Sequence, residues 1–478
     1  MYTRPSAVLL FGALAAAAPA PVPQESFVPG TDSQISASVQ PATTGYREQV
    51  YVSGYTSATF HGEYTGTPTT VGAANAPATL AASIPALPPN PTATYYNSQG
   101  VPLNPMPAPY MPAGGLGTNG TLPRYMVESD FDFESIALGL YQEWIELDLF
   151  HDGLARFTDE EFTEAGLGPE ARSLIEFMAD QETGHSTLLT NMLGERAPAQ
   201  CYYNYPYTTV REWVDFMQRV TRFGESGVWG FINHLDSREV GQLLAQSIAT
   251  EARQQMIFRQ MTGLTPMNVH FENGWPQSWA WTMLAPYISY CPQNETRLAW
   301  QNFPTLRILN NPNVNRYSPN DTAQDGSEQV GPRIVDPSVS NLTEGSCQNL
   351  NVTGYGCDPA IAHNKSEPLT FPGRKVLFEW EAPGQAVGPN NSYVTATTAG
   401  APKFVGWSQQ LNLTYTPLTV TGNNTGYSYQ PLGYVYGDNG IINGTMAVML
   451  TDLDLYVTPF NTSMLNPHIV ALGLYMAG

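Results

Sequence analysis

Apolar residues recur at helical spacing through the middle of the chain and predict four long helices. In the first of these, Ile136, Leu140 and Leu147 would all project from one face. The predicted helices span residues 133–157, 169–193, 210–235 and 237–262. Four consecutive helices of this length bury their apolar faces most economically by packing against one another as a bundle.

Residues typical of helix ends mark the boundaries of these segments. Thr158 and Glu161 have the spacing of a capping box at the start of a short connecting helix. Pro169 occupies the first turn of the second long helix, and Gly194 follows its last turn. Asp236 is the predicted N-cap of the fourth long helix.

The pattern changes after residue 372, where short alternating or apolar runs are separated by Gly, Asn and Pro. These runs predict strands at residues 375–381, 410–415 and 445–450. Between the helices and the strands, the tryptophan-rich segment 275–300 is expected to pack onto the bundle. The predicted fold class is therefore a multidomain α+β protein, with a four-helix bundle followed by a small β-rich C-terminal module.

The first quarter of the chain has a different composition. Arg4 precedes an apolar stretch from Ala7 to Ala18, which is typical of a secretory signal peptide and too short to span a bilayer as a helix. The next hundred or so residues are rich in Pro, Ala, Thr and Ser, which predicts a disordered stalk. The predicted order is signal peptide, stalk, helical bundle, sequon-rich connector and β-rich module, at residues 1–17, 18–124, 125–304, 305–372 and 373–478.

Asn-x-Ser/Thr sequons also indicate secretion, because they are glycosylated only in the secretory pathway. None of them lies between residues 125 and 290, where the helices are predicted. The candidate glycosylation sites are Asn119, Asn294, Asn320, Asn341, Asn351, Asn364, Asn390, Asn412, Asn423, Asn443 and Asn461.

The four cysteines are an even number, as expected for disulfides in a secreted protein. Three pairings are open from the sequence alone. We expect Cys201 to pair with Cys291 and tie the helical unit together, and Cys347 to pair with Cys357 and close a short loop.

The charge balance restricts the partners. The chain has 20 Lys and Arg against 41 Asp and Glu, which gives a formal net charge of −21. Because nucleic-acid binding needs clustered basic residues, no nucleic-acid partner is expected. The signal-like N-terminus and the sequons predict an extracellular location, with the cell wall or extracellular matrix as a candidate partner. The sequence shows no candidate transmembrane anchor. The oligomeric state stays open.

Glu182 and His185 carry the clearest chemical signal. Their Glu-x-x-His spacing places both side chains on one face of the second helix. The apolar residues assigned to that face are Leu174, Met178, Leu189 and Met192. A buried carboxylate without a partner costs several kcal/mol or shifts its pKa. The pair therefore needs a metal ion or hydrogen bonds from neighbouring helices.

The other helices supply further inward-facing donors. They are Glu143 and Glu146 on the first helix, Glu225 on the third, and Glu251 and Gln254 on the fourth. A single Glu on each of two helices, with Glu-x-x-His on the other two, is the di-metal pattern of ferritin-like bundles. Here Gln254 stands where the second histidine is expected, and an amide oxygen is a weaker ligand than imidazole for iron or manganese.

These motifs carry a family resemblance. Residues 143–157 resemble the first helix of the ferritin-like family that includes plant desiccation-related proteins. The layout of residues 125–478 resembles that of the fungal secreted stress-response and late-sexual-development proteins. The resemblance implies a ferritin-like fold and an association with stress or development, but no established reaction. It also implies metal-ligand positions at Glu143, Glu182, His185, Glu225 and Glu251.

Three functions stay open from the sequence. The first is a bundle that binds iron or manganese and resembles an oxidase. The second is a secreted structural or protective protein with a degenerate di-metal site, and it is favoured by Gln254, the stalk, the sequons and the acidic composition. The third is a cell-wall or glycan-binding module in the β-rich region. No catalytic residue and no enzymatic activity are assigned.

Overall fold

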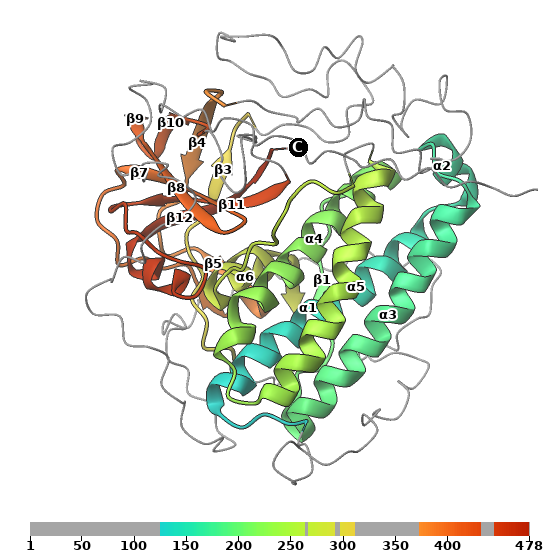
Figure 1. The fold of residues 1–478 in the computed structure, drawn as a ribbon. Helices are drawn as coiled ribbons and strands as arrows, with labels where there is room; N and C mark the ends of the chain where they lie inside the picture. The colour runs from blue at the N-terminus through green and yellow to red at the C-terminus, as the bar shows by residue number, and fades with distance from the viewer. Residues whose placement is uncertain (1–124, 263–265, 292–296, 311–371, 432–443, 478) are drawn as a thin grey trace, which may run out of the picture.

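The computed structural model describes residues 125–262, 266–291, 297–310, 372–431 and 444–477 (Figure 1). The predicted signal peptide and stalk lie outside these residues, as do Cys347, Cys357 and seven of the sequons. Among the described helices, none is both long enough and apolar enough to cross a membrane.

The helices form a bundle on one side of the molecule (Figure 1). The six α-helices of the described residues are α1 (Asp130–Arg156), α2 (Asp159–Glu164), α3 (Pro169–Leu193), α4 (Val210–Phe231), α5 (Arg238–Met261) and α6 (Gln277–Leu284). α1 contacts α3, α4 and α6, while α5 packs against α4 and α3. The four long helices α1, α3, α4 and α5 are those that the apolar spacing predicts, so the bundle is confirmed.

Several predicted helix ends are confirmed by hydrogen bonds. Thr158 and Glu161 form a reciprocal capping box at the start of α2. Pro169 begins α3, and Gly194 is the C-cap that ends it. The predicted cap at Asp236 is wrong, because Ser237 accepts the backbone N–H of Val240 and is the N-cap of α5.

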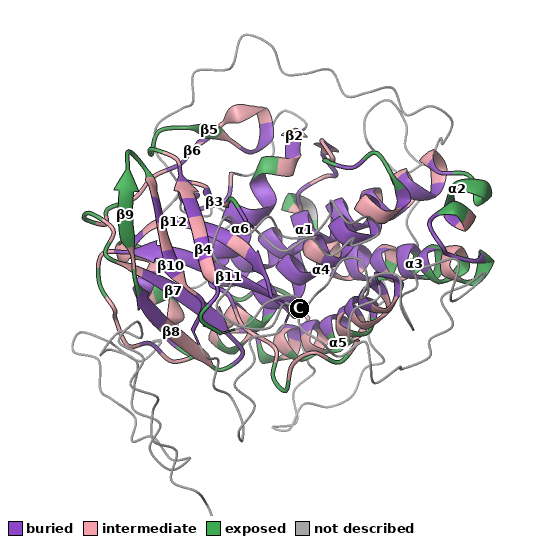
Figure 2. Ribbon diagram, turned by 90° about the horizontal axis from the view of Figure 1, so that it is seen from above, coloured by how far each residue is buried: buried purple, intermediate pink, exposed green. Residues whose placement is uncertain are grey.

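α1 is the central helix of the bundle. Every residue from Asp132 to Leu147 is buried, including the polar ones. α3 is less enclosed, and one residue assigned to its inner face is wrongly placed: Leu174 is 41% exposed, whereas its neighbour Ile175 is fully buried. Figure 2 shows the buried ribbon concentrated where the helices face one another and the sheets. The polar residues of α1 therefore need partners inside the protein.

In the residues that the structure describes, the C-terminal region contains two antiparallel four-stranded sheets. One has the order β3-β4-β10-β9, and the other has the order β12-β11-β7-β8. Residues 306–308, at the start of the predicted connector, form β3 and pair with β4. The strands of these sheets are β3 (Leu306–Ile308), β4 (Lys375–Trp380), β7 (Phe404–Gln409), β8 (Asn412–Pro417), β9 (Thr419–Gly422), β10 (Thr425–Tyr429), β11 (Thr445–Thr451) and β12 (Ile469–Met476).

The two sheets pack against each other through apolar side chains. Phe378 of β4 meets Trp407 of β7 edge to face, at 6.2 Å between ring centroids. The opposite face of the second sheet joins the core of the bundle through residues such as Met449 and Leu472. β11 is therefore buried on both faces, which explains its uninterrupted apolar sequence. The predicted order of a bundle followed by a β-rich region is confirmed.

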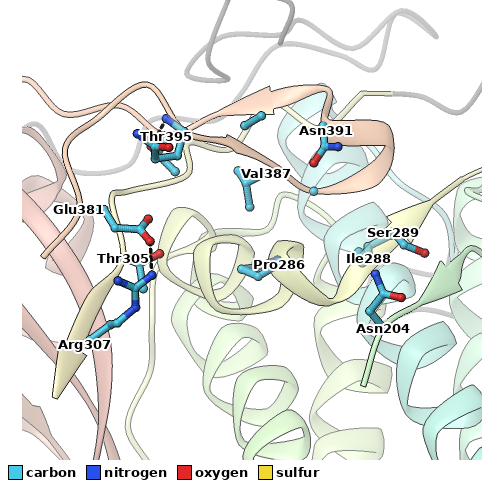
Figure 3. A pocket seen from close by; sticks show the side chains of 13 residues that line it. Asn204, Pro286, Ile288, Ser289, Thr305, Arg307, Glu381, Val387, Asn391 and Thr395 are labelled. Atoms are coloured by element: carbon cyan, nitrogen blue, oxygen red, sulfur yellow. Dashed lines mark hydrogen bonds and ion pairs between the residues drawn. The ribbon is translucent and has the colours of Figure 1, made fainter. Parts of the chain in front are cut away.

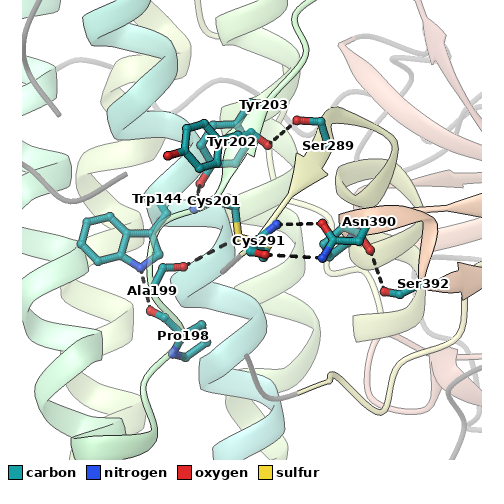
Figure 4. The surroundings of a disulfide bond; sticks show 11 residues. Trp144, Pro198, Ala199, Cys201, Tyr202, Tyr203, Ser289, Cys291, Asn390 and Ser392 are labelled. Atoms are coloured by element: carbon teal, nitrogen blue, oxygen red, sulfur yellow. Dashed lines mark hydrogen bonds between the residues drawn. A yellow bond between two sulfur atoms is a disulfide. The ribbon is translucent and has the colours of Figure 1, made fainter. Parts of the chain in front are cut away.

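A disulfide between Cys201 and Cys291 ties the bundle to the segment that leads into the sheets (Figure 4). It joins residues 90 positions apart and flanks a short two-stranded sheet of β1 (Tyr202–Tyr203) and β2 (Ile288–Tyr290). A second two-stranded sheet, β5 (Ala386–Val387) with β6 (Tyr393–Val394), lies nearby. The predicted Cys201–Cys291 pairing is thus present.

Candidate metal centre

Three helices each contribute two polar side chains, one turn apart, to the interior of the bundle. The six residues are Glu143 and Glu146 on α1, Glu182 and His185 on α3, and Glu251 and Gln254 on α5. All six are buried, and His185 is the most accessible at 9% exposure. The spacing of three residues puts each pair on one helix face, because three residues make nearly one turn. We refer to these six residues as the carboxylate cluster.

The imidazole of His185 lies among the carboxylates. Its Nδ1 atom is 3.1 Å from Oε2 of Glu182, 3.3 Å from Oε2 of Glu143 and 3.9 Å from Oε1 of Glu251. Ligand atoms of Glu143, Glu182 and His185 lie within 4.8 Å of one another, and so do those of Glu143, Glu146 and Glu251. The cluster therefore contains two adjacent three-residue groups that share Glu143.

Several side-chain oxygen atoms of this cluster have no hydrogen bond within the protein. Both carboxylate oxygens of Glu146, both of Glu251 and Oε1 of Gln254 are buried without a hydrogen-bond partner. A buried carboxylate left unpaired costs several kcal/mol unless it is protonated or bound to a cation. Carboxylate oxygens with one imidazole nitrogen are a donor set that suits iron or manganese. The residues present therefore fit a bound metal ion.

Burial raises the pKa of three glutamates in the carboxylate cluster. Desolvation raises the pKa of Glu143 to about 8, although His185 opposes the shift. Desolvation, reinforced by the other carboxylates, raises the pKa of Glu146 and Glu251 well above their usual range. Burial without a cation therefore favours the protonated form of all three carboxyls.

Glu182 and His185 behave as an ion pair within the cluster. Burial acts to raise the pKa of Glu182, but His185 and further hydrogen bonds outweigh it and lower the pKa. Burial acts to lower the pKa of His185, but Glu182 and Glu143 raise it well above its usual value. Each group thus favours the charged form of the other, and a metal ion would compete with the protons of the cluster.

Gln254 completes the cluster from α5. Its Nε2 donates a hydrogen bond to Oε1 of Glu182 over 2.5 Å and a longer one of 3.3 Å to Oε1 of Gln181. The amide therefore satisfies a carboxylate oxygen of Glu182 where the di-metal pattern would place a nitrogen ligand.

Glu225 lies apart from the carboxylate cluster and belongs to neither three-residue group. Its Oε2 is 3.3 Å from Nη1 of Arg222, and Arg222 also pairs with Glu272. On α4, Thr221 is the residue that lies beside Glu146. Of the predicted ligands, the structure brings together all except Glu225.

Thr250 was not expected to contact the cluster. Its Oγ1 lies 3.0 Å from Nε2 of His185, on the side of the ring away from the carboxylates. Thr250 directly precedes Glu251 in the sequence. Helical spacing relates residues of one helix, so the spacing from Glu182 or His185 does not predict a contact with a residue on another helix. Only the packing of α5 on α3 reveals this contact.

The four sequons in the described residues occupy different environments. Asn423 is exposed in the turn between β9 and β10, and Asn412 is partly exposed at the start of β8. Asn390 exchanges hydrogen bonds with the backbone of Cys291, as Figure 4 shows. Asn461 is buried, and its Oδ1 accepts hydrogen bonds from the backbone and side chain of Thr458.

A groove of about 440 Å³ lies between the β5–β6 hairpin, the start of β2 and the edge of the β3–β4 pair (Figure 3). Asn204, Ser289 and Asn391 line it, and Arg307 and Glu381 form an ion pair at one side. None of its thirteen lining residues is aromatic. Ligand sites are usually lined by apolar and aromatic side chains around a few polar groups, so this groove gives little support to a glycan-binding function.

The bundle and its inward-facing Glu and His residues define a ferritin-like protein. A model of the ferritin-like domain family matches residues 129–264, which include the whole carboxylate cluster. Protein rds1 of Schizosaccharomyces pombe (strain 972) is 48% identical over 368 residues, which cover 77% of this chain and 85% of the yeast protein. The chain therefore belongs to the fungal ferritin-like family that includes rds1.

Proposed function

We propose that this chain is a secreted protein of fungal stress response or sexual development whose helical bundle binds iron or manganese. The observation that carries the metal-binding proposal is the set of five buried oxygens without hydrogen-bond partners, on Glu146, Glu251 and Gln254, beside the imidazole of His185. A protein interior does not retain four unpaired carboxylate oxygens without protons or a cation.

The residues that would hold the metal have distinct roles. Glu143 belongs to both three-residue groups, so it would be a ligand in either group. Glu182 and His185 supply one carboxylate and one nitrogen on the α3 side, and Glu146 and Glu251 supply oxygens on the other. A bound iron or manganese ion would supply Lewis acidity and redox chemistry. The burial of these residues would shield the ion from solvent, and the protons that the ion displaces would be released.

Titration of the metal-stripped full chain with Mn(II), followed by calorimetry, tests this proposal. We expect saturable binding that is lost in Glu182→Ala, because that change removes a carboxylate and leaves His185 without its main partner. Glu225→Gln is the matched control, since Glu225 is also a buried glutamate but lies outside the cluster. Loss of binding in both variants, or in neither, would contradict the assignment.

A metal-free protective bundle is the second candidate, and one specific contact favours it. Gln254 and His185 both hydrogen-bond Glu182, so this carboxylate is satisfied without a metal ion. If the chain binds neither Mn(II) nor Fe(II) and Glu182→Ala unfolds at a lower urea concentration, the cluster serves stability instead.

Secretion and the link to stress or sexual development are separate parts of the proposal. The N-terminal apolar stretch, the sequons and the Cys201–Cys291 disulfide support an oxidising, extracellular destination. Expression of the full chain in a fungal host tests it. We expect the protein in the culture medium, shortened by the signal peptide, whereas retention inside the cells would contradict secretion.

A further inference from the structure

His185 directs its two ring nitrogens toward different partners. Nδ1 faces the carboxylates of Glu182 and Glu143, at 3.1 and 3.3 Å. Nε2 faces the hydroxyl of Thr250 on α5, at 3.0 Å. Which nitrogen carries hydrogen in a neutral imidazole is set by the hydrogen bond that the other side of the ring makes.

The hydroxyl of Thr250 has its single proton already engaged. Its Oγ1 donates to the backbone carbonyl of Ser247 over 2.7 Å, a bond within α5 that spans three residues. A hydroxyl has one donor and two acceptor lone pairs, so toward the ring it can only accept. With the hydroxyl proton on the Ser247 carbonyl, Nε2 carries the hydrogen that it shares with Thr250, which leaves the lone pair of a neutral ring on Nδ1.

We propose that Thr250 is a positioning residue, which fixes the hydrogen of His185 on Nε2 and thereby makes Nδ1 the metal-binding atom. This inference rests on the proposed metal site and adds to it the identity of the ligating nitrogen and of the group that orients the ring. Hydrogen-bond partners of ligating imidazoles typically change metal affinity by about 10–100-fold when they are removed.

Two substitutions separate the hydroxyl of Thr250 from its packing. Thr250→Val keeps the shape of the side chain and removes the acceptor, whereas Thr250→Ser keeps the hydroxyl and removes a methyl group. Electron paramagnetic resonance of free Mn(II) measures the binding affinity of each variant. We expect Thr250→Val to weaken Mn(II) affinity about tenfold or more. The affinity of Thr250→Ser should stay within about threefold of that of the unsubstituted chain. Equal binding by Thr250→Val, or equal weakening by both variants, would overturn the proposal.

A second readout does not depend on metal. In the metal-free full chain labelled with ¹⁵N-histidine, we expect a slowly exchanging Nε2–H signal from His185 in the unsubstituted protein and in Thr250→Ser. That signal should be lost from Thr250→Val, because its hydrogen-bond acceptor is gone. If the unsubstituted chain binds no Mn(II), the proposed metal site is wrong, and the Nε2–H signal alone tests the positioning role of Thr250. An unchanged signal in Thr250→Val would then overturn that role.

Discussion

The side-chain amide of Gln254 donates a hydrogen bond to Oε1 of Glu182 across 2.5 Å and so links α5 to α3 inside the bundle. The contact satisfies one oxygen of a buried carboxylate with a neutral group. It also leaves Oε1 of Gln254 without a partner and provides no nitrogen lone pair. The carboxylate cluster consequently has a single imidazole, that of His185, for its two groups of candidate ligands.

Restoring a second imidazole should therefore increase the metal capacity. We expect Gln254→His to raise Mn(II) binding from about one toward about two ions per chain, because imidazole is a stronger ligand than an amide oxygen. Equilibrium dialysis with elemental analysis measures the ratio. Gln254→Leu is the control, which removes the amide without adding a ligand. A ratio in Gln254→His no higher than in the unsubstituted chain would count against two adjacent metal positions.

Metal affinity should depend on pH with a defined sign. The pKa of Glu143 is raised to about 8 in the metal-free protein, so this ligand is protonated at lower pH and a metal ion must displace its proton. We expect apparent Mn(II) affinity to rise by about tenfold per pH unit for each displaced proton between about pH 6 and about pH 8. Calorimetry in buffers of different ionisation enthalpy counts the released protons, and an affinity independent of pH would contradict these shifts.

Two glycines on neighbouring helices should respond in opposite ways to alanine. A Cβ on Gly153 of α1 would lie 1.9 Å from the indole of Trp213, so Gly153→Ala should cost about 1–3 kcal/mol of unfolding free energy. A Cβ on Gly184 of α3 would meet nothing within 4 Å. Gly184→Ala should therefore stabilise the protein by about 0.5–1 kcal/mol. Urea unfolding measures both, and a neutral Gly153→Ala would show that α1 and α4 are less closely packed.

The fold should also determine which sequons are glycosylated. The Asn423 side chain is exposed, whereas that of Asn461 is buried and accepts the backbone N–H of Thr458 at 2.6 Å. In protein secreted from a fungal host, glycopeptide mass spectrometry should find a glycan on Asn423 and none on Asn461. A glycan on Asn461 with Asn423 bare would contradict this placement. Absence of glycan at every sequon would instead count against passage through the secretory pathway.

The sequence predicts the bundle well because its signals are local. Apolar spacing locates α1, α3, α4 and α5, and the three-residue spacing of Glu182 and His185 fixes their common face. Burial on one helix face is enough to predict that such a pair needs a partner. The presence of a second, sheet-forming region follows equally from its short alternating runs.

The partner of each buried group is not a local property, and here the sequence was less informative. Glu225 lies on a helix that contacts α1, α5 and α6, so its burial does not reveal that it pairs with Arg222 rather than with the cluster. Leu174 shares a helix face with buried residues but lies where α3 is uncovered. The contact between Thr250 and His185 likewise depends on how two helices are aligned.

Elemental analysis of the secreted full chain tests the central claim most directly, that the carboxylate cluster holds a metal ion. The chain and its Glu143→Gln variant are produced in medium supplemented with iron and manganese, because Glu143 belongs to both groups of candidate ligands. We predict at least about one ion of iron or manganese per unsubstituted chain. The variant should lose most of that metal. Less than about a tenth of an ion per unsubstituted chain, or equal metal in both proteins, would contradict the account.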